Sequence, residues 1–408
     1  MRTIAFSFIV IMTLMTSCQK EELQKMSEPV KIQLSTTEAA FVEQSNRFTF
    51  ELLSSVIDSP GNIMISPYSL SAALSMLANG ANGNTKDSIL ETIGFSGTEL
   101  GELNQYFKKV TSAVLVTDPG AKIIIANSIW YSKETSIKTP FVQANSQWYN
   151  ATVRSLDFSL PSAASTINQW CTENTDGLIN NIITRTDPYD IIYLLNALYF
   201  KVGWSENFKF SDKETHYAPF INDSFQPVEV KMMSKLYTYI AHIDNKLTYV
   251  TIPYGNAAFE YIGFLPAEGY SLNQIVNELK DSRYLKNIMN ERQLQRYALK
   301  MPKVKFSYDI DMNQILSKLG MSIIFNDNLA DFTNAFNGEN MFVSTVKQSN
   351  QIEINEMGTE AASVTSIYSA SAVSSSVLEF NRPFIFAIRE ISSGLILFIG
   401  KIGDPSLE

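Results

Sequence analysis

The sequence predicts one large α+β domain, on three observations. Helical patterns crowd the N-terminal half, strand-like runs crowd the C-terminal half, and no linker, internal repeat or low-complexity block interrupts residues 37–356. Separate blocks of helices and strands favour α+β over an alternating βαβ arrangement. With 408 residues, 45% of them hydrophobic, the chain can bury a sizeable core. We therefore expect a single domain from residue 37 to residue 408.

The expected helices follow the 3.6-residue period. The clearest one comes after Ser66-Pro67 and before Gly80 and Gly83, with apolar residues at i, i+3, i+4 and i+7. These apolar residues are Leu70, Ala73, Leu74 and Leu77. Further helices are expected at about 38–57, 85–94, 139–149, 163–175 and 310–319. Strands are expected at 123–131, 191–200, 247–253, 261–265, 384–389 and 395–402.

Composition excludes several classes of function. The net charge is −9, from 32 Lys plus Arg against 41 Asp plus Glu, so we expect no nucleic-acid partner. Two Cys and two His exclude a Cys-rich zinc site and a disulfide framework, and we expect neither a metal nor a cofactor. A Ser-x-x-Lys match at 344–347 lacks the accompanying Lys-Thr-Gly, and no G-x-S-x-G motif is present. We expect a protein that is not an enzyme.

The N-terminus has the layout of a signal peptide. Arg2 precedes an apolar run at 4–15, which is shorter than the roughly 20 residues of a bilayer span. Small residues directly before Cys18 resemble a bacterial lipoprotein signal, which implies a signal peptide over 1–17 and a lipidated Cys18. Residues 18–36 would form a flexible tether, and the protein would be anchored to the outer membrane or cell surface. The alternative is a plain secretory signal and an extracellular protein.

Cys171 is then the single cysteine of the domain. It follows Trp170 in an expected helix, so we expect a packed, unreactive thiol.

A Ser-rich segment at 357–379 departs from the rest of the chain. It has seven Ser, four Ala and only two charged residues, Glu360 and Glu379. Its β-branched and aromatic residues give it strand propensity, so it is not an ordinary linker. A long exposed loop that can become a strand is an aggregation hazard and persists mainly where it has a function.

Four separated segments resemble one family, the serpins. They are NIMISPYSLSAALSMLANGANGNT at 62–85, LNALYFKVGWSENF at 195–208, MPKVKFSYDIDMNQILSKLGM at 301–321, and IEINEMGTEAA at 352–362 with FNRPFIFAI at 380–388 and LFIGKIGDP at 397–405. The resemblance implies a serpin fold with three β-sheets, eight or nine helices and an exposed C-terminal reactive loop at about 357–379. It also implies a monomer that inhibits serine proteases rather than an enzyme.

The resemblance implies a mechanism in which the cleaved loop inserts into a central sheet as an added strand. The matching hinge residues are Glu356, Gly358, Thr359, Glu360, Ala361, Ala362 and Ser363. Alternate residues from Thr359 to Ser369 share one strand face and carry no charge, whereas Glu360 falls on the other face. Gly358 provides a swivel point. We therefore expect an inhibitory serpin; the alternatives are a non-inhibitory serpin or a surface binding protein.

Two counts locate the bond that a protease would cut. Fourteen residues after Gly358 and eight residues before Phe380 both give Ala372, so the expected reactive bond is Ala372-Val373. A small apolar residue before the cut suits an elastase-like pocket rather than the Asp-based pocket that binds Arg or Lys. The expected partner is thus an elastase-like serine protease, held as a covalent acyl complex.

Six further residues match positions that support the reactive loop in the family. Ser66, Ser69 and Asn196 match a buried polar cluster that controls sheet opening, and Trp204 matches the aromatic residue where the loop enters the sheet. The ion pair of Lys303 with the hinge Glu356 would contribute about 0–1 kcal/mol if exposed. Gln348 replaces a His of many relatives. Plain core packing is the alternative interpretation of these residues.

Overall fold

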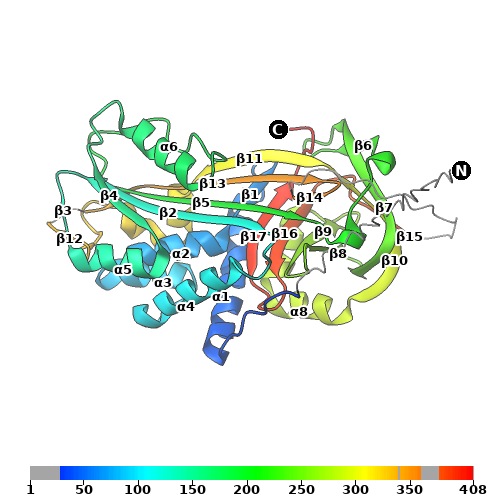
Figure 1. The fold of residues 1–408 in the computed structure, drawn as a ribbon, viewed down its shortest axis with the longest axis horizontal. Helices are drawn as coiled ribbons and strands as arrows, with labels where there is room; N and C mark the ends of the chain where they lie inside the picture. Colours follow the sequence, from blue (N-terminus) through cyan, green and yellow to red (C-terminus); the bar gives the residue numbers. More distant parts are fainter. Residues whose placement is uncertain (1–27, 339–340, 360–375, 408) are drawn as a thin grey trace, which may run out of the picture.

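The computed structural model describes residues 28–338, 341–359 and 376–407. Figure 1 shows most of the helices along one side of a long, twisted sheet and another helix on its opposite side, with a second sheet crossing the first. The described residues contain nine α-helices: α1 (Thr36–Val56), α2 (Pro67–Ala78), α3 (Gly83–Thr92), α4 (Leu100–Val114), α5 (Thr139–Tyr149), α6 (Ala163–Asn174), α7 (Leu272–Lys280), α8 (Ser282–Glu291) and α9 (Asn313–Leu316).

The strands form three sheets. The central one has the order β11 (Val304–Asp311), β13 (Val343–Asn355), β14 (Gly358–Thr359), β5 (Ile192–Gly203), β2 (Lys122–Ser132), β4 (Thr152–Leu156). A nine-stranded sheet has the order β1 (Ile63–Ile65), β17 (Ile396–Ile402), β16 (Phe384–Glu390), β9 (Phe259–Pro266), β8 (Leu247–Tyr254), β7 (Pro227–Ile243), β10 (Gln293–Pro302), β15 (Ser376–Glu379), with β6 (His216–Ile221) beside β7. The third sheet pairs β3 (Ser136–Ile137) with β12 (Phe336–Asn337). The expected α+β serpin architecture is confirmed.

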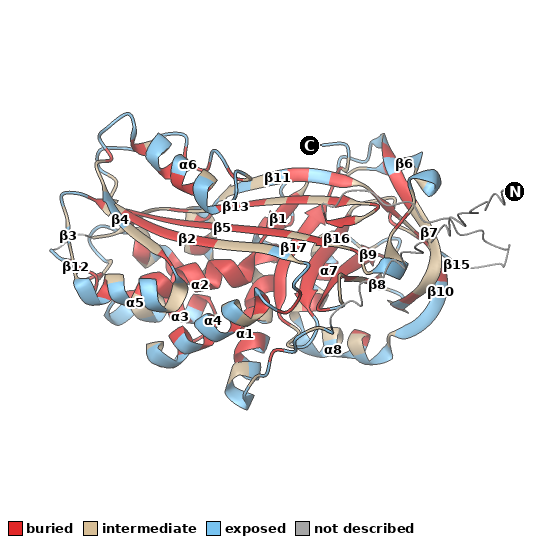
Figure 2. Ribbon diagram, viewed as in Figure 1, coloured by how far each residue is buried: buried red, intermediate tan, exposed pale blue. Residues whose placement is uncertain are grey.

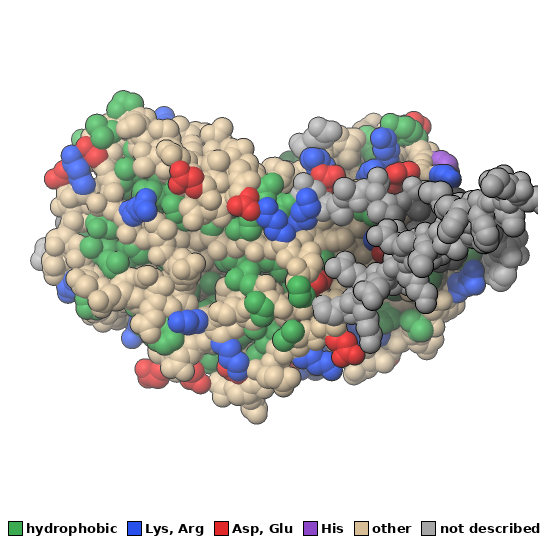
Figure 3. Space-filling model, viewed as in Figure 1, with side chains coloured by type: hydrophobic (Ala, Val, Ile, Leu, Met, Phe, Trp, Pro, Cys, Tyr) green, Lys and Arg blue, Asp and Glu red, His purple; other side chains and the backbone are tan. Residues whose placement is uncertain are grey.

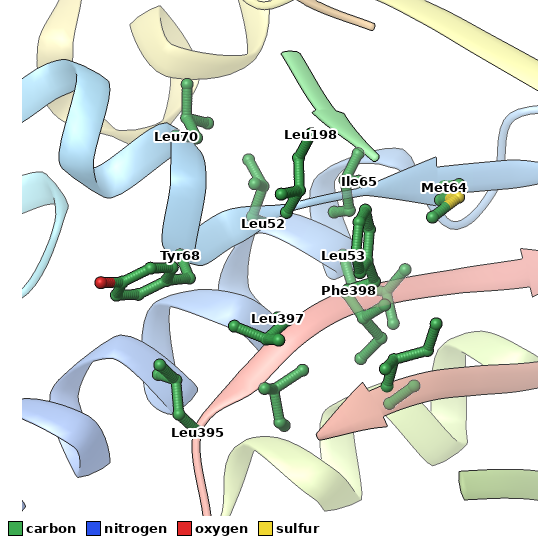
Figure 4. Close-up of a cluster of buried hydrophobic side chains, with 14 of the residues drawn as sticks. Leu52, Leu53, Met64, Ile65, Tyr68, Leu70, Leu198, Leu395, Leu397 and Phe398 are labelled. Atoms are coloured by element: carbon green, nitrogen blue, oxygen red, sulfur yellow. The ribbon is translucent and has the colours of Figure 1, made fainter. Parts of the chain in front are cut away.

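The central strand β5 is covered on both faces. Its first nine residues are all buried, as expected for a strand between two helical layers. Leu194 and Leu198 join the main core beneath the sheet, where α2 packs, whereas Tyr193 and Leu195 join a second core beneath α6. Figure 4 shows Leu198 within the main cluster, and Figure 2 shows the buried run along β5. Alternate side chains of one strand thus link two hydrophobic cores.

The end of the expected tether lies against the domain. The sequence predicted a flexible segment through residue 36, but Val30 and Ile32 within it are hydrogen-bonded to the body of the domain. Val30 N donates to the carbonyl of Thr117 at 3.2 Å, and Ile32, only 7% exposed, donates from its N to Ser392 Oγ. The physical reason is that Ile32 is apolar and packs into the core, which anchors the chain before Ser35 caps α1.

Most of the expected elements are present, and several others escaped the sequence patterns. The predicted helix at 310–319 is partly wrong, because β11 continues to Asp311 and α9 begins only at Asn313. Helices α4, α7 and α8 and the long strands β7 and β10 were not predicted. Strand β7 pairs with β6, β8 and β10 along different parts of its length, so its burial alternates irregularly and shows no clean period.

Charges of both signs are mixed on the surface of the protein. On the face drawn in Figure 3, Lys and Arg side chains are interspersed with Asp and Glu rather than collected into a stripe. Within the described part of the chain, no helix has the length and apolar character needed to cross a bilayer.

Candidate functional site

The site begins where the two central strands separate. Strands β5 and β13 run parallel and pair from Ile192 with Val343 to Tyr199 with Gln351. Beyond that point β14 lies between them, antiparallel to both: Thr359 is opposite Ile354 of β13 and Val202 of β5. The first residues of the expected reactive loop therefore already occupy the central sheet.

Gly358 has no room for a side chain. Its φ is +137°, and a Cβ atom would lie 2.5 Å from the backbone N of Trp204 and from Cα of Gly203. Both the conformation and the close backbone approach require glycine. The sequence predicted that Gly358 is a swivel point, and the structure adds that no side chain fits at this position.

Thr359 faces the interior of the molecule. It is 1% exposed, and its Oγ1 lies 2.8 Å from the hydroxyl of Tyr254. Tyr254 stacks on Trp204 with ring centroids 4.4 Å apart and planes at 13°. Burial raises the pKa of Tyr254 above its usual value, although the hydrogen bond with Thr359 opposes the shift. The Tyr254 hydroxyl therefore stays protonated and pairs with the hydroxyl of Thr359 on β14.

Trp204 holds the turn that precedes β14. Its backbone N donates to the carbonyl of Met357 at 2.7 Å, and its Nε1 donates to the carbonyl of Asn355 at 2.9 Å. Phe210 N donates to the carbonyl of Glu356 at 2.8 Å. Three consecutive carbonyls of the turn are thus fixed from the side of β5, where the loop enters the sheet.

Glu356 and Lys303 form the expected ion pair, but not at the surface. Lys303 Nζ lies 2.6 Å from Glu356 Oε2, and the side chains are 31% and 7% exposed. Burial alone would raise the pKa of Glu356, but hydrogen bonds, chiefly from Lys303, outweigh it and lower the pKa. The contribution expected for an exposed pair does not apply, because the carboxylate would be left buried without its partner.

A second group of polar residues lies farther along the same strands. Gln348 Oε1 accepts from Ser66 N at 2.8 Å, and its Nε2 donates to the Ser66 carbonyl and to Asn196 Oδ1. Asn196 Nδ2 donates to Ser69 Oγ at 2.5 Å and to Asn127 Oδ1 at 2.7 Å. All five residues are buried. The network bridges β13, β5, β2 and α2 beneath the paired part of the sheet.

The six expected support residues thus divide into two groups. Ser66, Ser69, Asn196 and Gln348 form one network, whereas Trp204 and Lys303 contact Asn355 and Glu356, just before β14. Asn196 and Trp204 are eight residues apart on and just beyond β5, roughly 26 Å for an extended chain. The first group lies beside the paired part of β5 and β13, and the second lies where β14 separates these two strands.

Three contributing residues were not predicted. Asn127 lies opposite Asn196 in the β2–β5 register, and Asn350 donates to Gln348 Oε1 at 3.1 Å and to the carbonyl of Met64. Asn350 could have been predicted from the sequence, because residues two apart on a strand share a face and Gln348 was already a candidate. Tyr254 could not have been predicted, because only the fold brings β8 next to Thr359.

Several expected residues fall outside the described part of the chain. They are Cys18, Glu360, Ala361, Ala362, Ser363, Ala372 and Val373. Cys171 lies within it and is fully buried; burial raises the pKa of its thiol to about 12, as for an unreactive cysteine. Among the described residues no group of three or more His, Cys, Asp or Glu could hold a metal ion.

Comparison with known proteins agrees with this geometry. The family model for serpins, serine protease inhibitors, matches residues 43–405. The chain therefore belongs to the serpin family of serine protease inhibitors.

Relatives cover nearly the whole domain. Serpin-ZX of Arabidopsis thaliana is 30% identical over 84% of this chain and 92% of its own. The human leukocyte elastase inhibitor is 27% identical over 88% of this chain and 98% of its own. Among solved structures, native tengpin, a thermophilic serpin, has a TM-score of 0.84 at 28% identity, covering 93% of this chain and 97% of its own. Thyroxine-binding globulin in complex with thyroxine has a TM-score of 0.81 at 27% identity, and the match covers 90% of this chain and 99% of the globulin chain.

Proposed function

We propose that this protein is an inhibitory serpin that traps an elastase-like serine protease after cleavage at Ala372-Val373. The protease serine attacks the carbonyl carbon of Ala372, the amide bond to Val373 breaks, and Val373 leaves with a new amino terminus. The protease remains joined to Ala372 as an ester. Insertion of the segment from Thr359 onward then carries the protease away before water can hydrolyse the ester.

The position of β14 is the observation that carries the proposal. Gly358 and Thr359 pair with both central strands, so the sheet accepts residues of the loop in the register that insertion needs. Further insertion would exchange the eight residue pairs between β5 and β13 for two antiparallel ladders. The uncharged alternate residues that follow Thr359 in the sequence are compatible with the interior face.

The choice of an elastase-like protease rests on Ala372. A one-carbon side chain fills a shallow pocket and leaves the carboxylate of a trypsin-type pocket without a partner. The human leukocyte elastase inhibitor among the relatives supports the same class of target.

Incubation with an elastase tests the mechanism directly. An inhibitor gives a covalent complex that survives SDS, and the C-terminal fragment released from cleaved inhibitor under denaturing conditions begins at Val373. Cleavage without any complex would favour the alternative of a non-inhibitory serpin or a surface binding protein. A fragment that begins elsewhere would move the reactive bond and leave the inhibitor class intact.

We also propose that Cys18 carries a lipid that anchors the protein to a bacterial envelope membrane. Small residues before Cys18 and the short apolar run at 4–15 support this placement. Replacing Cys18 by Ala should move the protein from the membrane fraction to the soluble fraction. Equal membrane partitioning of parent and variant would contradict a lipid anchor.

A further inference from the structure

Three hydrogen-bond donors converge on the sulfur of Met289 in α8. Arg389 Nη1, from β16, lies 3.2 Å from Met289 Sδ, and the hydroxyl of Tyr249, from β8, lies 3.5 Å from it. Arg292, the C-cap residue of α8, also donates to this sulfur from its Nη1 at 3.5 Å. A thioether is a weak acceptor, whereas a guanidinium forms its strong hydrogen bonds with an oxygen that carries negative charge. The donors of this cluster are therefore stronger than the acceptor between them.

Two of the donors are fixed by the large sheet. Arg389 is 8% exposed and lies opposite Glu260 in the register of β16 with β9. Its Nε and Nη2 both donate to Glu260 Oε1, whereas its Nη1 donates to Met289. Tyr249 is buried, and burial raises the pKa of its hydroxyl to about 12, so the hydroxyl remains a donor at neutral pH. Neither group can turn to bulk water, so both depend on the sulfur as an acceptor.

Met289 can be reached by a small molecule from solvent. The residue is partly exposed, and Figure 2 shows most of α8 as exposed or intermediate. Other methionines of the described ranges, such as Met233 and Met312, are buried. Met341 is partly exposed as well, but within the described residues its sulfur accepts no hydrogen bond. Met289 thus combines access from solvent with three donors, and Met341 offers the same access without them.

We propose that Met289 is a reversible oxidation site for a hydroperoxide such as hydrogen peroxide. The sulfur gives a lone pair to one peroxide oxygen and the O–O bond breaks. The departing hydroxide takes the proton of the sulfur-bound oxygen and leaves as water. The sulfur is thereby oxidised by two electrons to a sulfoxide, and the peroxide is reduced to water. The sulfoxide oxygen is the strong acceptor that the donors of Tyr249, Arg292 and Arg389 lack.

Oxidation at this position stabilises the fold, in contrast to its usual effect. A methionine sulfoxide normally disrupts its surroundings because it places a polar group among apolar ones. Around Met289 the nearest polar groups are two guanidiniums and a phenol, so the new oxygen replaces a weak acceptor by a strong one. Because the donors belong to β8, β16 and the end of α8, the sulfoxide links the helix to two strands of the large sheet. This inference does not depend on the reactive loop or on its target protease.

Peroxide treatment of the folded protein tests the site. Peptide mass spectrometry should find Met289 and Met341 oxidised, and Met233 and Met312 reduced. The change in melting temperature on treatment should be about 2 °C more favourable for the parent than for Met289→Leu, which keeps the apolar volume without the sulfur. Treatment with a methionine sulfoxide reductase should remove the difference between treated and untreated parent.

Two further variants separate the donors from the oxidation itself. Met341→Leu is the matched control and should respond to peroxide as the parent does. Tyr249→Phe keeps the ring and removes one donor, so Met289 should still be oxidised but the gain in melting temperature should be smaller than in the parent.

The inference is overturned by either of two results. One is a Met289 that stays reduced while Met341 is oxidised, which would mean that the donors protect the sulfur. The other is a peroxide response of the parent that is equal to or less favourable than that of Met289→Leu, which would mean that Met289 only fills space. The mass spectrometry and the comparison with Tyr249→Phe remain decisive if Met289→Leu does not fold.

Discussion

The hydroxyl of Tyr254 lies 2.8 Å from Oγ1 of Thr359, and both residues are buried. Tyr254 belongs to β8 of the large sheet, and Thr359 belongs to the reactive-loop hinge within the central sheet. The contact thus joins the two sheets through the first loop residue that faces the interior. A substitution at Thr359 should therefore disturb the contact between the two sheets directly.

A charge at residue 359 should separate cleavage from inhibition. Thr359→Arg places a guanidinium beside Tyr254 in a site that is 1% exposed, which costs several kcal/mol and slows insertion. The variant should be cut at the same bond as the parent but should need a much higher inhibitor-to-protease ratio, measured by titration of protease activity. Glu360→Arg is the matched control, since strand alternation assigns residue 360 to the opposite face. Equal ratios for Thr359→Arg and the parent would remove insertion from the mechanism.

Cleavage of the loop should stabilise the protein. Insertion of a full strand would replace one parallel ladder between β5 and β13 with two antiparallel ladders. It would also supply hydrogen-bond partners where these two strands separate beyond Tyr199. For a large domain about 2 °C of melting temperature corresponds to 1 kcal/mol, so several kcal/mol should raise the melting temperature by about 10 °C or more. Calorimetry of intact and elastase-cleaved protein measures the change. Identical melting temperatures would show that no strand is added.

A histidine at residue 348 should make sheet opening sensitive to pH. Gln348 is fully buried and bonds to Ser66 and Asn196, so an imidazolium there would be a buried cation without an acidic partner. In Gln348→His the folded-state pKa of the introduced imidazole would lie below the unfolded value of about 6.5, because burial disfavours the charged form. Stability relative to the parent should be retained above pH 6.5 and lost as the pH falls below it.

The measurement for that variant is the melting temperature of parent and Gln348→His at several pH values between about 8 and 5. Gln348→Asn controls for the loss of packing and hydrogen bonds without adding a titratable group. Parallel curves for the histidine variant and the parent would mean that the cluster tolerates the charge.

The Glu356–Lys303 pair should make the stability of the protein fall in acid. The pKa of Glu356 is lowered from its ordinary value of 4.5, since the hydrogen bonds to its carboxylate outweigh the opposing effect of burial. A group with a lowered folded-state pKa stabilises the protein above its unfolded value, and the contribution is lost as the pH falls through the folded value. The parent should therefore lose more unfolding free energy than Glu356→Gln as the pH falls below about 4.5.

Chemical denaturation across that pH range measures the difference, and Glu379→Gln provides a control at a more exposed pair. Lys300 and Glu379 are 3.4 Å apart with side chains 39% and 36% exposed, so their pair should contribute at most about 1 kcal/mol. A Glu356→Gln variant that follows the parent at every pH would contradict the role of the buried pair.

Substitution of the residue before the cut should redirect the inhibitor. Ala372→Arg offers a guanidinium to the carboxylate of a trypsin-type pocket and is too large for an elastase-type pocket. The rate constant of complex formation should rise for trypsin and fall for elastase by at least 100-fold, the scale of about 2.7 kcal/mol. Unchanged preference would place the reactive bond at another residue.

The family could be recognised from the sequence because its motifs are local. Gly358, Thr359 and the uncharged alternation that follows lie next to one another in the chain, and strand geometry converts such a run directly into two faces. Ser66, Ser69 and Gln348 were recognised by matching short segments, and the structure brings them together with Asn196.

Tertiary structure decided what depends on residues distant in the chain. Ile32 is hydrogen-bonded to Ser392, which lies 360 residues later in the chain. Glu356 is buried because the turn closes beside Phe210. Tyr254 contacts Thr359, which lies 105 residues later. None of these contacts leaves a periodic signal, since each depends on how separate sheets pack rather than on the spacing of neighbours along one strand. The sequence by itself identified Gly358 and Thr359 as candidate hinge residues, and the tertiary structure decided that both already lie within the central sheet.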